Sequence, residues 1–114
     1  MTIIYHNPRC RKSRETLELL EQNKEEIRII KYLETPPSKQ ELEDIIDLLG
    51  IAPIDLVRKN ETIWKENFKG KEYTNDEVIK IMAENPKLIE RPIVIKNKKA
   101  VIGRPPQKVL DILW

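Results

Sequence analysis

Short apolar runs alternate along the chain with longer stretches that are apolar on one side only. Residues 2–5 and 27–32 are rich in β-branched and aromatic side chains, which predicts two strands. Between them, residues 11–23 place Leu17 and Leu20 on one side of a helix, with charged side chains on the others. The pattern predicts a β-α-β opening in which the two strands are parallel.

The middle of the chain, about residues 38–90, is predicted to be a block of helices. Two capping boxes mark helix starts within it, because Ser38 is followed by Glu41 and Thr74 by Glu77. A capping box pairs a hydroxyl side chain and a carboxylate with each other's backbone N–H groups. No strand is expected inside this block.

Alternating apolar residues return after the helical block. Residues 91–96 and 99–102 are predicted to form a hairpin around a tight turn at Asn97-Lys98, followed by a last short helix through Leu113. The complete order is β-α-β, helical insertion, β-β-α. This order predicts an α/β chain of thioredoxin-like fold, with a mixed four-stranded sheet, in a single domain over residues 1–114.

Composition narrows the classes of function. The 114 residues include 21 Lys and Arg against 19 Asp and Glu, well interspersed, so no basic arm for nucleic acid or a membrane surface is present. No apolar run approaches the roughly 18 residues of a membrane span, and the first residues do not resemble a signal peptide. We expect a cytoplasmic monomer that binds neither nucleic acid nor membrane.

Cys10 stands where a strand ends, a turn follows and a helix begins. The first N–H groups of a helix have no intrahelical partners, and the helix dipole adds positive charge there. Both effects stabilise a thiolate, the reactive form of cysteine, and can hold an anion. Arg9, Arg11, Lys12 and Arg14 add further positive charge. The segment predicts a nucleophile and an oxyanion site together, rather than an inert core cysteine.

The chain has one cysteine and one histidine, which excludes an intramolecular disulfide and disfavours a metal site. An oxidised Cys10 must therefore be regenerated by a thiol from another molecule, such as glutathione or a glutaredoxin. Ser13 either donates a hydrogen bond to the thiolate or is an ordinary residue of the first helical turn. His6 either supports the cysteine loop or is structural. We expect no bound metal or organic cofactor.

Three more arginines stand out by their surroundings. Arg58 closes a short predicted helix, Arg91 precedes Pro92 at a strand entrance, and Arg104 precedes Pro105 at a strand exit. Read singly, each is a surface arginine. Read together, they suggest a clamp, because arginine suits bidentate recognition of an oxyanion. In a thioredoxin-like fold a cis proline opens the third strand, which makes Pro92 the candidate, whereas Pro105 and Pro106 are expected to form a simple rigid turn.

Four ordered blocks resemble the glutaredoxin-coupled arsenate reductase family. The blocks are spread over nearly the whole chain. They read HNPRC with SRETL (residues 6–17), YLETPP (32–37), PKLIERPIV (86–94) and IGRPP (102–106). The resemblance implies a cysteine that attacks arsenate to form a covalent adduct. Glutathione then attacks, arsenite leaves, and glutaredoxin reduces the mixed disulfide.

The family's site residues carry over by position. The resemblance implies that Cys10 is the nucleophile and that three arginines bind the oxyanion: Arg58, Arg91 and Arg104. It also implies that His6 tunes the cysteine and that Ser13 hydrogen-bonds its thiolate. Two alternatives stay open: a redox-responsive regulator that binds the RNA polymerase alpha subunit, and a general glutathione-dependent thiol reductase. Regulators of that branch typically carry Cys-x-x-Cys, whereas this chain has Cys-x-x-Ser.

Overall fold

The computed structural model describes residues 1–113 and divides the chain into two compact units. The sheet unit combines Met1–Thr35 with the chain from Arg91 onward, and the helical unit comprises Pro36–Glu90. The bounds of the helical unit lie close to those expected for the insertion. That both units belong to one folding domain stays a prediction.

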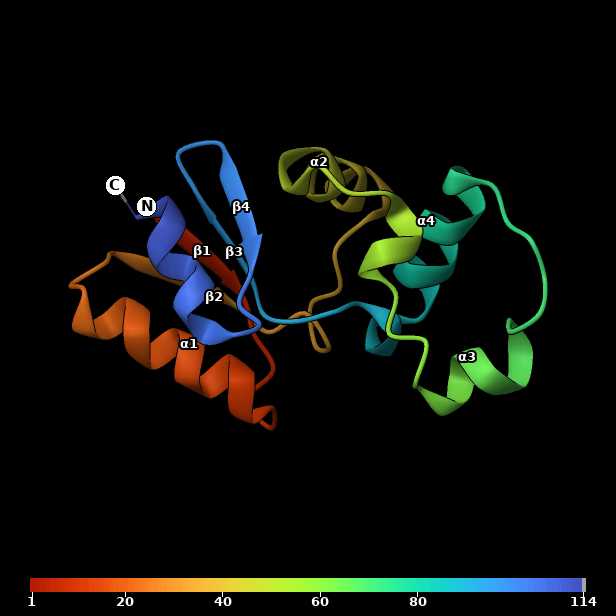
Figure 1. The fold of residues 1–114 in the computed structure, drawn as a ribbon, viewed down its shortest axis with the longest axis horizontal. Coiled ribbons are helices and arrows are strands. Elements are labelled where there is room, and N and C mark those ends of the chain that lie inside the picture. The colour runs from red at the N-terminus through yellow and green to blue at the C-terminus, as the bar shows by residue number, and fades with distance from the viewer. Residues whose placement is uncertain (114) are drawn as a thin grey trace. The chain divides into compact units, whose positions relative to one another are not determined.

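The sheet unit holds four strands and two helices (Figure 1). In chain order they are β1 (Thr2–Tyr5), α1 (Arg11–Gln22), β2 (Ile27–Ile30), β3 (Ile93–Lys96), β4 (Lys99–Ile102) and the 3₁₀ helix η3 (Pro106–Ile112). The second strand ends at Ile30, slightly earlier than expected. The last helix is 3₁₀ rather than α-helical.

The four strands form one mixed sheet in the order β2-β1-β3-β4. The β1–β2 pair is parallel, and the β1–β3 and β3–β4 pairs are antiparallel, so Ile4 lies between Ile29 and Val94. The β3–β4 turn is tight, with positive φ angles of 50° at Asn97 and 63° at Lys98. Such a turn matches the twist of the strands it joins. This topology confirms the predicted thioredoxin-like sheet.

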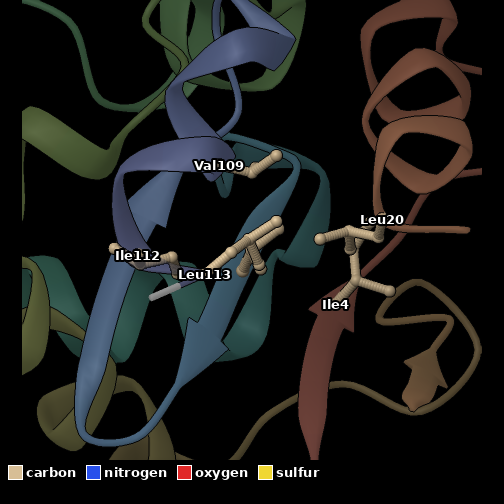
Figure 2. Packing of buried hydrophobic residues seen from close by; sticks show 6 residues of the cluster. Ile4, Leu20, Val109, Ile112 and Leu113 are labelled. Carbon is tan, nitrogen blue, oxygen red and sulfur yellow. The ribbon is translucent and has the colours of Figure 1, made fainter. Parts of the chain in front are cut away.

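The core of the sheet unit lies between the sheet and its two helices (Figure 2). Ile4, Leu20, Val94 and Val109 are fully buried there, with Leu113 4% exposed. Burying one such aliphatic side chain contributes about 1.5–3 kcal/mol. Strand residues alternate between faces, so Ile4 and Val94 both point at α1 and η3. Helix α1 therefore has a fixed position against the strand that precedes it.

A polar network fastens the start of β1 to the end of β3. Glu25 accepts a hydrogen bond of 2.6 Å from Thr2 Oγ1 and forms an ion pair of 2.7 Å with Lys96 Nζ. Lys96 also donates to the carbonyl of Leu113 at 2.9 Å. The Lys96 hydrogen bond, followed by that of Thr2, holds the pKa of Glu25 below its ordinary value.

The helical unit contains three α-helices and two 3₁₀ turns. These are α2 (Lys39–Leu49), η1 (Pro53–Leu56), α3 (Thr62–Asn67), α4 (Asn75–Glu84) and η2 (Pro86–Leu88). Both predicted capping boxes are present, at Ser38 before α2 and at Thr74 before α4. The expectation of purely helical structure is wrong in one place, because Val57 and Ile89 form an isolated antiparallel bridge.

Over residues 1–113, the longest apolar helical segment falls short of what a membrane crossing requires.

Candidate active site

The sheet topology brings four segments to one edge of the sheet unit. Strands β1 and β2 are parallel and end at this edge, β3 starts there, and β4 ends there. Two backbone hydrogen bonds mark the edge: His6 N–H to the Ile30 carbonyl at 2.8 Å, and Gly103 N–H to the Pro92 carbonyl at 2.9 Å. Because Cys10 follows β1 in the same place, we call this the Cys10 edge.

Cys10 is the N-cap residue of α1 and is half-buried. Its N–H donates to the Asn7 carbonyl at 3.0 Å, and the Asn7 side chain accepts from the Arg9 N–H at 3.0 Å. Arg14, one turn into the helix, donates from Nη1 to the Pro8 carbonyl at 3.0 Å. These bonds close the loop between β1 and α1, and they hold the thiol beside the free N–H groups of the first helical turn.

His6 and Ser13 form a buried pair beneath this loop. Their exposed fractions are 5% and 0%, and His6 Nδ1 lies 2.6 Å from Ser13 Oγ. Ser13 Oγ also accepts from the Asn7 N–H at 3.0 Å. Burial, and then the charges of Lys31 and Arg14, lower the pKa of His6, so the imidazole is neutral at pH 7. The pair therefore braces the loop through Ser13, while a bond from Ser13 to the thiolate stays a prediction.

Two of the three candidate arginines lie at the Cys10 edge. Arg104 Nη1 lies 3.9 Å from Cys10 Sγ and donates to the Arg91 carbonyl at 3.4 Å. Arg91 is partly buried, and its Nε and Nη1 atoms are shielded from solvent. The Arg91–Pro92 and Arg104–Pro105 peptide bonds are both cis. The cis bond expected at Pro92 is thus present, and Pro105, expected only as part of a rigid turn before the last helix, is cis as well. A cationic side chain from the segment that follows β4 thus lies next to the sulfur.

The third candidate, Arg58, belongs to the helical unit. Its Nη1 pairs with Glu61 Oε1, and its Nε lies 3.6 Å from Glu90 Oε1. Its N–H donates to the Leu88 carbonyl at 2.7 Å, beside the Val57–Ile89 bridge. Arg58 is therefore held by two carboxylates of its own unit, Glu61 and Glu90, and neither pairing was expected.

Gly103 is a residue of this site for which no separate role was predicted. A Cβ atom there would lie 2.6 Å from Thr16 Oγ1 and 2.9 Å from Pro92 Cγ. Thr16 is fully buried and donates to the Lys12 carbonyl at 2.7 Å. The end of β4 therefore passes closely between α1 and Pro92, and this close approach positions Arg104. A glycine directly before the conspicuous Arg-Pro-Pro run was the only signal for it.

The geometry supports nucleophilic chemistry on an anion. Cys10 Sγ sits at a helix N-terminus with a guanidinium 3.9 Å away, and both of these groups can bind an oxyanion. Within residues 1–113, no group of three or more His, Cys, Asp or Glu side chains is arranged to hold a metal ion.

Known proteins match this chain over nearly its whole length. Residues 5–112 match the ArsC family. The chain is 48% identical to the uncharacterized protein YfgD of Escherichia coli K12 over 112 residues, which cover 96% of this chain and 94% of that protein. It is 41% identical to an arsenate reductase of Neisseria meningitidis, over 96% of each chain. The solved arsenate reductase from Vibrio cholerae matches with a TM-score of 0.93 and 48% identity, over 98% of this chain and 97% of that one.

Proposed function

Because the chain belongs to the ArsC family, we propose that it is an arsenate reductase whose nucleophile is Cys10. The observation that carries this proposal is the position of Cys10 Sγ, at the N-terminus of α1 and 3.9 Å from Arg104 Nη1. A relative that is 41% identical over 96% of this chain bears the name arsenate reductase, which supports the choice of oxyanion.

In the first step, the Cys10 thiolate attacks the arsenic atom of arsenate. A bond forms between sulfur and arsenic, and one arsenate oxygen leaves as water after it is protonated, so arsenic remains As(V). Arg91 and Arg104 bind the remaining oxygens and offset their negative charge. That Arg58 is the third arginine of the clamp stays a prediction, because its guanidinium is paired with Glu61 and Glu90 within the helical unit.

In the second step, the thiolate of glutathione attacks Cys10 Sγ. A disulfide forms between Cys10 and glutathione, and the sulfur–arsenic bond breaks with its electron pair on arsenic. Arsenic leaves as As(III) in arsenite, while two thiols are oxidised to one disulfide. Glutaredoxin then reduces the mixed disulfide, since the chain has no second cysteine to do so. A reducing cytoplasm keeps glutathione and glutaredoxin in their thiol forms.

His6 and Ser13 act as positioning residues in this scheme. Ser13 links His6 Nδ1 at 2.6 Å to the Asn7 N–H at 3.0 Å, and Asn7 in turn accepts the N–H of Cys10. A neutral His6 adds no charge beneath the thiolate. Its contribution is therefore geometric: it keeps the loop in the conformation that presents Cys10 to the oxyanion.

The test is arsenate-dependent NADPH oxidation, coupled through glutathione, glutaredoxin and glutathione reductase. Cys10→Ser should abolish turnover and leave the circular dichroism spectrum unchanged, since the hydroxyl is a far weaker nucleophile. A Cys10→Ser variant that kept its rate would disprove the mechanism.

The clamp is tested separately by Arg91→Lys, which keeps the charge and loses bidentate geometry. The KM for arsenate should rise by about 10-fold, the effect of roughly 1.4 kcal/mol of lost binding. Arg28→Lys is the matched control, because Arg28 is an exposed arginine of β2, and its KM should match that of the wild type. An unchanged KM in Arg91→Lys would remove Arg91 from the clamp.

A further inference from the structure

A cavity of about 290 Å³ lies beside the cysteine loop in the sheet unit. One wall is the loop itself, from His6 to Arg9, and the other is formed by the residues that follow β2, namely Lys31, Leu33 and Glu34. Its volume lies near the lower end of the range for small-molecule pockets, about 300–1,000 Å³. Nothing in the first step of the proposed reaction uses it.

The strand order separates this cavity from the arginines. Along the Cys10 edge, the segments follow the order β2, β1, β3, β4. The cavity lies on the β2 flank of the cysteine loop, whereas Arg91 and Arg104 lie on the β3–β4 flank. The cysteine loop therefore has the cavity on one flank and the two arginines on the other.

The cavity walls are mixed in character. Lys31 and Arg9 are cationic, Glu34 is anionic, and Leu33 is an aliphatic side chain that is 40% exposed. This set suits a small flexible peptide that carries both signs of charge, because opposite charges pair across the walls and the aliphatic surface covers methylene groups. Glutathione has two carboxylates, one ammonium group and two peptide bonds, which matches that description. Arsenate offers no positive charge and no methylene group.

The direction from which the donor thiolate attacks Cys10 Sγ in the second step also separates the donor from the arsenic. When a thiolate displaces a group from sulfur, the attacking atom, the sulfur and the leaving atom lie roughly in line. Arsenic in the adduct is held on the arginine flank of Cys10, beside Arg104 Nη1 at 3.9 Å from the sulfur. The attacking thiolate must then reach Cys10 Sγ from the side away from Arg104, and the cavity lies beside the cysteine loop on its β2 flank.

We propose that this cavity is the subsite for the thiol donor, and that Lys31 and Glu34 are its charged contacts with glutathione. The inference rests on the proposed function for the use of a thiol donor, but it concerns a separate group of residues. In this arrangement the oxyanion and the donor occupy opposite sides of Cys10. The disulfide bond forms on the cavity side as the sulfur–arsenic bond breaks on the arginine side.

The kinetic test compares two donors in arsenite release: glutathione, and 2-mercaptoethanol, which lacks carboxylate and ammonium groups. The quantity measured is the ratio of kcat/KM for glutathione to that for 2-mercaptoethanol. Lys31→Glu should lower this ratio by about 10-fold, the loss expected for one charge-assisted hydrogen bond. Any change in the reactivity of Cys10 affects both donors and cancels in the ratio. The matched control is Lys98→Glu, at the β3–β4 turn on the opposite edge, which should leave the ratio unchanged. A Lys31→Glu variant with the wild-type ratio would overturn the assignment.

A binding test needs no turnover. S-methylglutathione, whose sulfur cannot react, is titrated into the ¹⁵N-labelled wild type. Saturable amide shifts should cluster at His6, Asn7 and Arg9 and in residues 31–34, and Lys31→Glu should weaken them. Shifts confined to Arg91, Gly103 and Arg104, or no saturable shifts, would overturn the proposal. Shifts at the cavity in a protein that does not reduce arsenate would support the subsite and reject the proposed function, so the two failures are distinguishable.

Discussion

Gly103→Ala is the smallest change that tests how the fold positions Arg104. The added Cβ would lie 2.6 Å from Thr16 Oγ1, 3.0 Å from Thr16 Cγ2 and 2.9 Å from Pro92 Cγ. Neither neighbour can yield easily, because the Pro92 ring is rigid and Thr16 is buried and bonded to the Lys12 carbonyl at 2.7 Å. The end of β4 must therefore move away from α1, and Arg104 moves with it.

The expected cost follows from two opposing terms. Overpacking a buried site typically costs about 1–3 kcal/mol. Replacing glycine by alanine restricts the unfolded chain, which stabilises the native state by about 0.4–1 kcal/mol. The net loss in the free energy of unfolding should be about 1–2 kcal/mol. Activity should fall more steeply, since a displacement near 1 Å at a site of chemistry can cost about 10²-fold in rate.

Urea unfolding followed by circular dichroism measures the first effect, and arsenate turnover measures the second. A double-mutant cycle then identifies the contact. Thr16→Ala removes both threonine atoms near the new Cβ, so Gly103→Ala should cost about 1 kcal/mol less in that background. Thr16→Ser is the matched control, because it keeps the oxygen at 2.6 Å and should give little relief. Additive costs in the Thr16→Ala background would refute the steric reasoning.

Two further predictions concern pH. Burial, and then the charge of Lys31, lower the pKa of His6 from 6.5, so the unfolded chain binds this proton more tightly than the native protein. The contribution of neutral His6 to the free energy of unfolding should be complete above about pH 6.5 and should decline as the pH falls toward the pKa of His6 in the folded protein. A His6→Gln variant whose free energy of unfolding declined equally steeply would contradict this. The Lys96 hydrogen bond holds the pKa of Glu25 below 4.5, so its contribution should persist above about pH 4.5 and vanish in stronger acid. Glu25→Gln should lower stability at pH 7 by about 1–2 kcal/mol, and equal urea midpoints for variant and wild type would show that the ion pair contributes nothing.

Local signals in the sequence predicted most of the secondary structure. The capping boxes at Ser38 and Thr74 are present because each depends on residues only three apart. The turn at Asn97-Lys98 is likewise local, since it needs two adjacent residues that adopt positive φ. The last helix shows the limit of such signals. Apolar residues three apart fit both an α-helix and a 3₁₀ helix, so the pattern through Leu113 did not distinguish them.

The candidate site was harder to predict because its contacts join distant segments. Ser13 meets His6 across the β1–α1 junction rather than following the helical spacing to Cys10. The close approach of Gly103 to Thr16 depends on the order of the strands, which no local pattern contains. The contact of Arg58 with Glu90 depends on the Val57–Ile89 bridge, in a segment where only helices were expected. The residue types near Cys10 predicted the kind of chemistry, but they did not predict which residues contact and position the site.

The two ends of the sheet have different tolerances for engineering. All four segments that carry chemistry meet at the Cys10 edge, whereas the β3–β4 turn lies at the other end of the strands. Asn97 and Lys98 are exposed there, and exposed loop tips accept insertions and attached groups well. A fluorophore, an affinity tag or a surface linker placed at this turn would leave the approaches to Cys10 open. A protein immobilised through this turn would be attached at the end of the strands opposite to Cys10.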